Sequence, residues 1–195
     1  DPRQFIGYIV SEAGNLEEVI FKKNGLHIRI KIDPKDKIGE MDKASISDIY
    51  LEAALSTIMD CEDSVAAVDA KDKVLAYRNW LGLMKGDLEE KVNKNGNVIT
   101  RKLNQDIRYI NNEHKERSLK GRSLMLIRNV GHLMTNSAIL DNEGNEIAEG
   151  LMDTICTSLI AIHDLIKSNG LRNSLHKSIY IVKPKMHGPE EVQFT

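Results

Sequence analysis

The sequence predicts an α/β protein in which parallel β/α units are combined with a largely antiparallel layer. Three short apolar stretches, which begin near residues 57, 123 and 178, each precede a helix or the start of one. Helical crossovers between buried strands are typical of a parallel sheet. Residues 1–40 and 88–122 are instead rich in hairpin signals, which indicates antiparallel pairing.

The first antiparallel region begins with an expected strand over residues 5–10. Residues 17–23 and 26–32 then flank Asn24 and Gly25, a pair that strongly favours a tight hairpin turn. Apolar and polar residues alternate in the second arm. The alternation predicts a strand with one buried and one solvated face.

Capping signals predict helices on either side of the first apolar stretch. Ser45 and Asp48 resemble a capping box, so we expect a helix from there to about residue 55. Asp69 and Asp72 resemble a second cap, followed by apolar residues at helical spacing. The apolar residues and the closing glycine of this second helix are Val74, Tyr77, Trp80, Leu81, Met84 and Gly86.

The second half of the chain repeats the pattern of strand and helix. Asn95 and Gly96 predict a further hairpin, and residues 123–130 predict a second buried strand. A loop is expected over 131–147, and residues 178–182 predict a third buried strand. A long amphipathic helix is expected between the last two strands, with these residues facing inward: Leu151, Ile155, Leu159, Ile162 and Ile166.

Composition limits the classes of function. The net charge of −2 argues against binding to nucleic acid or to a membrane surface through bulk electrostatics. No apolar run approaches the ~20 residues of a membrane helix. Cys61 and Cys156 form no metal-binding pattern, so we expect a reduced, cytoplasmic protein. Both ends look cut, and we expect the sequence to be a piece of a larger protein.

Residues with chemical potential follow directly after the apolar strands. Asp60, Glu62 and Asp63 follow the first strand, and Arg128 ends the second. In a parallel sheet these strand ends would share one edge. Acids there can hold a divalent cation, directly or through its waters, and an arginine can bind a carboxylate or stabilise an oxyanion. The third strand would add Lys183, Lys185 and His187.

Simpler interpretations of these residues stay open at this point. The acids can cap the following helix and face water, and Arg128 can form an ion pair with one of them. The lysines can be solvated loop charges, and the histidines can be satisfied or exposed side chains without a ligand.

Several long motifs resemble malate synthase, in particular the long G form of that family. They are residues 51–55 (LEAAL), 60–69 (DCEDSVAAVD), 77–80 (YRNW), 128–136 (RNVGHLMTN) and 181–191 (IVKPKMHGPEE). The resemblance covers nearly the whole chain and is weakest in residues 1–20 and 104–118.

The resemblance implies a Mg²⁺-dependent Claisen condensation of acetyl-CoA with glyoxylate and water, which yields malate and CoA. It implies that Arg128 binds glyoxylate and stabilises the enolate, and that Ser64 and Arg101 contact acetyl-CoA. Asp60 and Glu62 would hold the waters of the metal, in its outer shell. The direct metal ligands and the catalytic base would lie beyond this chain.

The resemblance also implies a domain organisation. Residues 1–55 and 86–124 would form an inserted α/β domain, and residues 56–85 and 125–195 part of a TIM barrel. We expect the full-length protein to be a monomer and this chain alone to be inactive. Because an unclosed barrel exposes strand edges, we also expect the chain to self-associate or to leave its last strand and helix loosely ordered.

Two other functions are compatible with these residues. One is a CoA-binding module without catalysis, in which Arg101 holds the CoA phosphates. The other is a different oxo-acid lyase on a citrate-lyase-like barrel, which would need a second metal-binding acid at another strand end. No such acid follows Arg128 before Asp141, which disfavours the lyase.

Overall fold

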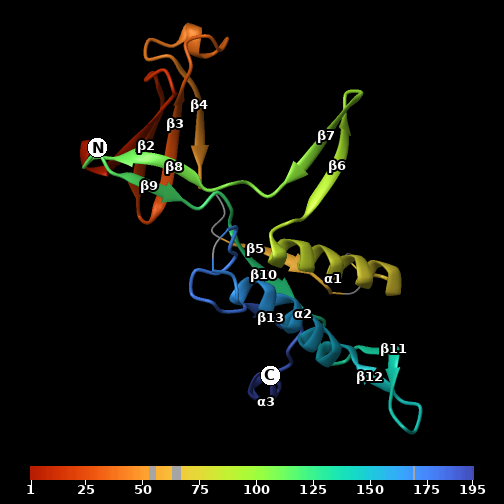
Figure 1. Cartoon of the computed structure of the whole chain (residues 1–195). Coiled ribbons are helices and arrows are strands. Elements are labelled where there is room, and N and C mark those ends of the chain that lie inside the picture. The colour runs from red at the N-terminus through yellow and green to blue at the C-terminus, as the bar shows by residue number, and fades with distance from the viewer. Residues whose placement is uncertain (53–55, 63–66, 169) are drawn as a thin grey trace. The chain divides into compact units, whose positions relative to one another are not determined.

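A computed structural model describes residues 1–52, 56–62, 67–168 and 170–195 (Figure 1). The chain divides into two compact units, Asp1–Leu55 with Gln105–Gly121, and Ser56–Asn104 with Arg122–Thr195. The first unit contains η1 (Pro2–Gln4), β1 (Phe5–Val10), β2 (Leu16–Lys23), β3 (Leu26–Ile32), η2 (Gly39–Met41), β4 (Ile46–Leu51), β8 (Ile107–Asn111) and β9 (Glu116–Leu119). The second contains β5 (Ser56–Asp60), α1 (Ala70–Lys85), β6 (Glu89–Lys94), β7 (Asn97–Lys102), β10 (Leu124–Arg128), β11 (Thr135–Leu140), β12 (Glu146–Ala148), α2 (Glu149–Leu165), β13 (Ile181–Val182) and α3 (Pro189–Phe194).

The first unit is built on a six-stranded sheet in the order β4-β3-β2-β1-β8-β9. Every neighbouring pair in it is antiparallel. The predicted hairpin between β2 and β3 is confirmed, because Asn24 and Gly25 both have positive φ values, 51° and 83°. Two residues with positive φ form the turn whose twist suits a two-residue hairpin.

The helix predicted after Ser45 is wrong. Residues 46–51 form strand β4, which pairs antiparallel with β3 so that Ile49 lies opposite Ile30. Ser45 has a φ of 57° and does not cap a helix; the turn before β4 is held by Asp42, whose Oδ1 accepts from the backbone N–H of Ile46. Pairing with a neighbouring strand outweighs the local capping pattern.

The second unit contains the parallel sheet that the sequence predicts, in the order β13-β10-β5. β10 lies in the centre and pairs with β5 over its whole length, from Leu124 opposite Ser56 to Arg128 opposite Asp60. The third strand is shorter than the predicted 178–182, because only Ile181 and Val182 pair with β10.

Helix α1 begins and ends where its capping residues predict. The Asp69 side chain accepts from the N–H of Asp72 at 2.8 Å, and Gly86 ends the helix in the left-handed conformation with a φ of 82°. Trp80 is 1% exposed, and its Nε1–H donates to the Thr157 carbonyl of α2 at 3.0 Å. The core between the helices and the parallel sheet consists of Cys61, Ala76, Trp80, Met84, Ile127 and Ala161.

Helix α2 presents a different face to the core from the one predicted. The five apolar residues predicted to face inward are between 44% and 73% exposed: Leu151, Ile155, Leu159, Ile162 and Ile166. The buried face instead includes Asp153, Thr157, Ala161 and Asp164. The apolar periodicity was recognised correctly, but the face that packs on the sheet carries polar residues with buried partners, described below.

Two further differences concern segments outside the three parallel strands. The predicted loop over 131–147 contains an antiparallel hairpin, β11 and β12. The predicted hairpin at Asn95 and Gly96 is confirmed as β6 and β7, and it groups with the second unit by its contacts. Within the described ranges, no helix is long and apolar enough to cross a membrane.

We predict that Ile127→Ala lowers the free energy of unfolding of the second unit by about 2–5 kcal/mol, because this side chain is fully buried in the central strand. The measurement is urea unfolding followed by the fluorescence of Trp80, the single tryptophan of the chain. The matched control is Ile58→Ala on β5, where the side chain is 51% exposed. That control should change the free energy by about 0.5 kcal/mol, and equal losses in the two variants would contradict the assigned core.

Candidate functional site

The candidate site lies at the carboxyl ends of β5 and β10, where an acid and an arginine meet. Asp60 and Arg128 are the last residues of their strands and lie opposite each other in the parallel register. The guanidinium binds the carboxylate with two hydrogen bonds, Nε to Oδ1 at 2.9 Å and Nη2 to Oδ2 at 2.6 Å. The strand ends are also joined through the backbone, because the N–H of Cys61 donates to the Arg128 carbonyl.

This ion pair fixes the charge of both partners. The hydrogen bonds from Arg128 lower the pKa of Asp60 below its usual value of 3.8, against the opposing effect of burial. The same contact raises the pKa of Arg128. Both side chains keep some exposure, 29% for Asp60 and 37% for Arg128, so the pair is accessible from solvent. The predicted proximity of the acid and the arginine is therefore confirmed, together with the ion pair between them.

Glu62 is the second acid of the predicted set, and it is almost completely buried. Its side chain is 6% exposed, and Oε1 accepts from Lys185 Nζ at 2.5 Å. Its other oxygen, Oε2, is buried without a hydrogen-bond partner among the described residues. A buried carboxylate oxygen without a donor is unfavourable, so this atom is suited to a ligand that donates a hydrogen bond.

The three basic residues after β13 have separate roles. Lys185 pairs with Glu62, as above, and Lys183 Nζ donates to the Val130 carbonyl at 2.6 Å. Burial lowers the pKa of Lys183. His187 instead faces the last helix, where its backbone N–H donates to Glu191 at 2.7 Å. The structure thus brings the two lysines to the strand ends but places the histidine elsewhere.

Cys61, between the two acids, is not suited to be a nucleophile. Its side chain is fully buried, and burial, together with the charge of Asp153, raises the pKa of the thiol to about 12. The thiolate is the reactive form of cysteine, so the side chain stays protonated and unreactive at neutral pH. Cys61 contributes to the core instead.

Other predicted site residues are not joined to this pair. Ser64 and Asp63 lie outside the described residues. Arg101 lies exposed on β7, opposite Glu90 of β6, and within the described ranges no hydrogen bond or ion pair joins it to Asp60 or Arg128. No group of three metal-binding side chains is found in the part of the chain that the structure describes.

Sequence reasoning missed the buried partners of the strand ends, Lys73 of α1 and Asp153 of α2. Their signal in the sequence is weak: each is a charged residue on a helix face that also carries buried apolar positions. From the sequence alone, a charged residue in a helix is expected to lie on the solvent-exposed face.

We predict that Asp60→Asn removes a contribution to stability that depends on pH. The folded-state pKa of Asp60 lies below its usual value of 3.8, so the pair stabilises the fold above that pH and loses its effect as the pH falls through the folded-state pKa. The difference in the free energy of unfolding between wild type and variant should stay constant from pH 7 to 5 and shrink below about pH 4.

Urea unfolding followed by Trp80 fluorescence measures this difference. A partly exposed pair of this kind contributes about 1 kcal/mol or less, so replicate titrations are needed. The control is the same substitution in an Arg128→Gln background, where the pH-dependent part should shrink to what the N–H of Glu62 and the charge of Lys73 contribute. A difference that grows on acidification would refute the assignment.

Comparisons with known proteins identify the family of this chain. Residues 124–195 match the family described as "Malate synthase, TIM barrel domain". Malate synthase G of Halalkalibacterium halodurans is 55% identical over 194 residues, which is 100% of this chain and 26% of that protein. The chain is also 55% identical to malate synthase G of Corynebacterium glutamicum, over 92% of this chain and 24% of that protein. Malate synthase G of Corynebacterium efficiens is 55% identical as well, over 98% of this chain and 25% of that protein.

The chain thus spans about a quarter of the length of the curated relatives it matches. The similarity extends over its whole length, and the TIM-barrel family match covers residues 124–195, which include β10, α2 and β13. The parallel β/α units of the second unit agree with that match. On these grounds the chain belongs to the malate synthase family and corresponds to a segment of malate synthase G.

Proposed function

We propose that this chain forms part of the active site of a malate synthase, which condenses acetyl-CoA with glyoxylate and water to give malate and CoA. The observation that carries the proposal is the Asp60–Arg128 pair at the carboxyl edge of the parallel sheet, in a chain 55% identical to malate synthase G. In barrel enzymes this edge is the one that bears the chemistry. The proposed activity is that of the whole enzyme, and the residues of this chain supply part of its active site.

Arg128 is suited to bind glyoxylate and to stabilise the enolate of acetyl-CoA. A guanidinium has five N–H donors, and two of its nitrogens, Nε and Nη2, are bound to Asp60. No described residue accepts a hydrogen bond from Nη1, so that part of the fork is available to a substrate oxygen. Because Asp60 already holds the plane of the guanidinium, little reorganisation is needed as charge develops on the substrate.

The reaction that this proposal implies removes a proton from the methyl group of acetyl-CoA, using a base outside this chain. The resulting carbon–carbon bond joins that methyl carbon to the aldehyde carbon of glyoxylate, and the aldehyde oxygen takes up a proton. Water then cleaves the thioester of malyl-CoA to release malate and CoA. In these steps Arg128 orients glyoxylate and offsets the negative charge of the enolate oxygen.

Mg²⁺ is the proposed cofactor, and Asp60 and Glu62 fit an outer-shell role. Mg²⁺ usually keeps several of its waters, which donate hydrogen bonds to nearby carboxylates. The buried Oε2 of Glu62, without a donor among the described residues, is suited to such a water. When bound, the metal would polarise the carbonyl of the oxo acid. Its direct ligands would come from parts of the enzyme outside this chain.

We further propose that Arg101 and Ser64 contact acetyl-CoA and that the first unit belongs to the inserted domain. Arg101 is exposed on the β6–β7 hairpin, as a side chain that binds phosphates must be. The contacts of the chain group the hairpin that carries Arg101 with the second unit. Self-association of the isolated chain also stays a prediction.

We predict that the 195-residue chain alone converts no acetyl-CoA and glyoxylate. The family resemblance places the base and the direct metal ligands outside it, and losing groups that act together costs about 10⁴–10⁶ in rate. The measurement is release of the CoA thiol, detected with a thiol reagent, against a control without protein. Malate synthase G of Halalkalibacterium halodurans serves as the positive control. Turnover above background would refute the proposed division of the site.

We predict that a chimera restores activity when residues 1–195 replace the matching quarter of the Halalkalibacterium enzyme. In this chimera Arg128→Lys should lower kcat by about 10²–10³-fold, because a single ammonium cannot replace a planar fork of donors. The matched control is Arg108→Lys, at a side chain that is 83% exposed in the first unit. A folded chimera in which both arginine variants keep wild-type kcat would contradict the role of Arg128.

A further inference from the structure

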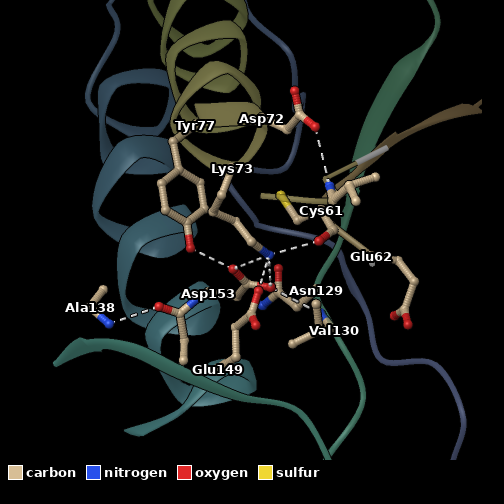
Figure 2. A network of polar contacts seen from close by, with 12 residues as sticks. Cys61, Glu62, Asp72, Lys73, Tyr77, Asn129, Val130, Ala138, Glu149 and Asp153 are labelled. Carbon is tan, nitrogen blue, oxygen red and sulfur yellow. Dashed lines mark hydrogen bonds and ion pairs between the residues drawn. The ribbon is translucent and has the colours of Figure 1, made fainter. Parts of the chain in front are cut away.

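A cluster of buried charges lies behind the candidate site, between helices α1 and α2 (Figure 2). Lys73 is 5% exposed, Glu149 is 6% exposed and Asp153 is fully buried. Lys73 Nζ lies 2.6 Å from Glu149 Oε1 and 3.2 Å from Asp153 Oδ1. None of these three residues belongs to the proposed catalytic set.

The cluster is connected to both strand ends through backbone atoms. Lys73 Nζ donates to the carbonyl of Cys61 at 2.7 Å, and Cys61 lies between Asp60 and Glu62. Asp153 Oδ2 accepts from the N–H of Val130 at 2.9 Å, two residues after Arg128. One ion pair between two helices therefore holds the exit of β5 at one end and the exit of β10 at the other.

Additional donors complete the environment of Asp153. The Tyr77 hydroxyl donates to Oδ1 at 2.5 Å, from the turn of α1 that follows Lys73. Burial and this hydrogen bond both raise the pKa of Tyr77, so it remains a donor. Burial alone would lower the pKa of Lys73, but contact with Glu149 and Asp153 outweighs it, and the lysine stays charged.

Val130 is held through its carbonyl as well as through its N–H. Its carbonyl accepts from Lys183 Nζ at 2.6 Å, and the ammonium lies against Gly150 of α2. A Cβ at position 150 would collide with that ammonium. The N–H and the carbonyl of Val130, which belong to two successive peptide groups, are therefore both bound by charged side chains, which restrains the backbone directly after Asn129.

Attraction between the charges does not by itself explain such a cluster. Buried ion pairs often stabilise no more than apolar residues of the same volume, because the loss of hydration offsets their attraction. Apolar residues here would leave the Cys61 carbonyl and the Val130 N–H buried without partners. The charged side chains thus provide hydrogen-bond partners for backbone groups beyond the ends of the strands, which no longer pair with a neighbouring strand.

We propose that Lys73 and Asp153 are positioning residues. They hold the end of β5, which carries Asp60, and the end of β10, which carries Arg128, at a fixed separation. The inference rests on the proposed function in that Arg128 is taken as the group that meets substrate. The positioning itself is a property of this chain and can be measured without substrate. Figure 2 shows the Glu62 side chain pointing away from the cluster, so the cluster acts on the backbone of the acidic exit.

The test is hydrogen exchange of the Arg128 Nε–H in the 195-residue chain, followed by ¹⁵N NMR and assigned through Arg128→Lys. This N–H is protected by Asp60 and reports directly on the pair. Exchange of the Trp80 indole N–H serves as internal reference for unfolding of the whole unit, because it is buried and bonded to Thr157. The measured quantity is the ratio of the two exchange rates.

Asp153→Asn should raise this ratio by about tenfold, as expected for the loss of one hydrogen bond to a charged group. The matched control is Asp164→Asn, a buried aspartate of the same helix that accepts from the N–H groups of Asn173 and Ser174 instead. It should destabilise the unit while leaving the ratio within about twofold of wild type. Equal changes in the two variants would overturn the proposal.

Tyr77→Phe provides a second measurement if Asp153→Asn does not fold. This variant keeps every charge paired and removes only the hydroxyl donor to Asp153. It should raise the ratio by a smaller factor, about threefold, consistent with one neutral donor. A ratio equal to that of wild type in Tyr77→Phe would overturn the proposal. Failure of the chimera to make malate would count against the proposed function but would leave these ratios unaffected.

Discussion

The parallel register between β5 and β10 is the constraint on which the candidate site depends. It places Arg128 opposite Asp60 at the last pair of the ladder, and the bidentate contact follows from that placement. Side chains alternate between the two faces of a strand, so a shift by one residue would send the arginine to the opposite face from the acid. The backbone bond from Cys61 to the Arg128 carbonyl extends the ladder one step and secures the register at the functional end.

Sequence reasoning succeeded where one local interaction decides the structure. The turn at Asn24 and Gly25 needs two positive φ values, which few other residue pairs tolerate, so the hairpin could be read directly. Helix α1 begins at the side-chain cap of Asp69 and ends at the left-handed Gly86, and each of these signals depends only on neighbouring residues. The strand exits at Asp60 and Arg128 were recognised because apolar runs stop at charged residues.

Predictions from the sequence were wrong where contacts between segments distant in the chain determine the structure. Ser45 and Asp48 satisfy a capping pattern, yet pairing with β3 converts the segment after them into a strand. In α2 the apolar stripe containing Ile155 and Leu159 is exposed, whereas Asp153 is fully buried. Hydrophobic periodicity shows which residues share a face, but it does not show which face a neighbouring element covers. A buried ion pair between residues 80 positions apart leaves no local pattern at all.

The orientation of α2 follows from the needs of the strand ends. A parallel strand that leaves its sheet carries backbone donors and acceptors away from their ladder partners, and those groups must be satisfied when buried. An apolar helix face cannot do this, whereas Asp153 accepts from the N–H of Val130. The helix therefore turns Asp153 toward the strand ends. The same face of α2 also places Ala161 in the apolar core, so the polar contact at the sheet edge that bears Arg128 and the apolar packing agree in the orientation of the helix.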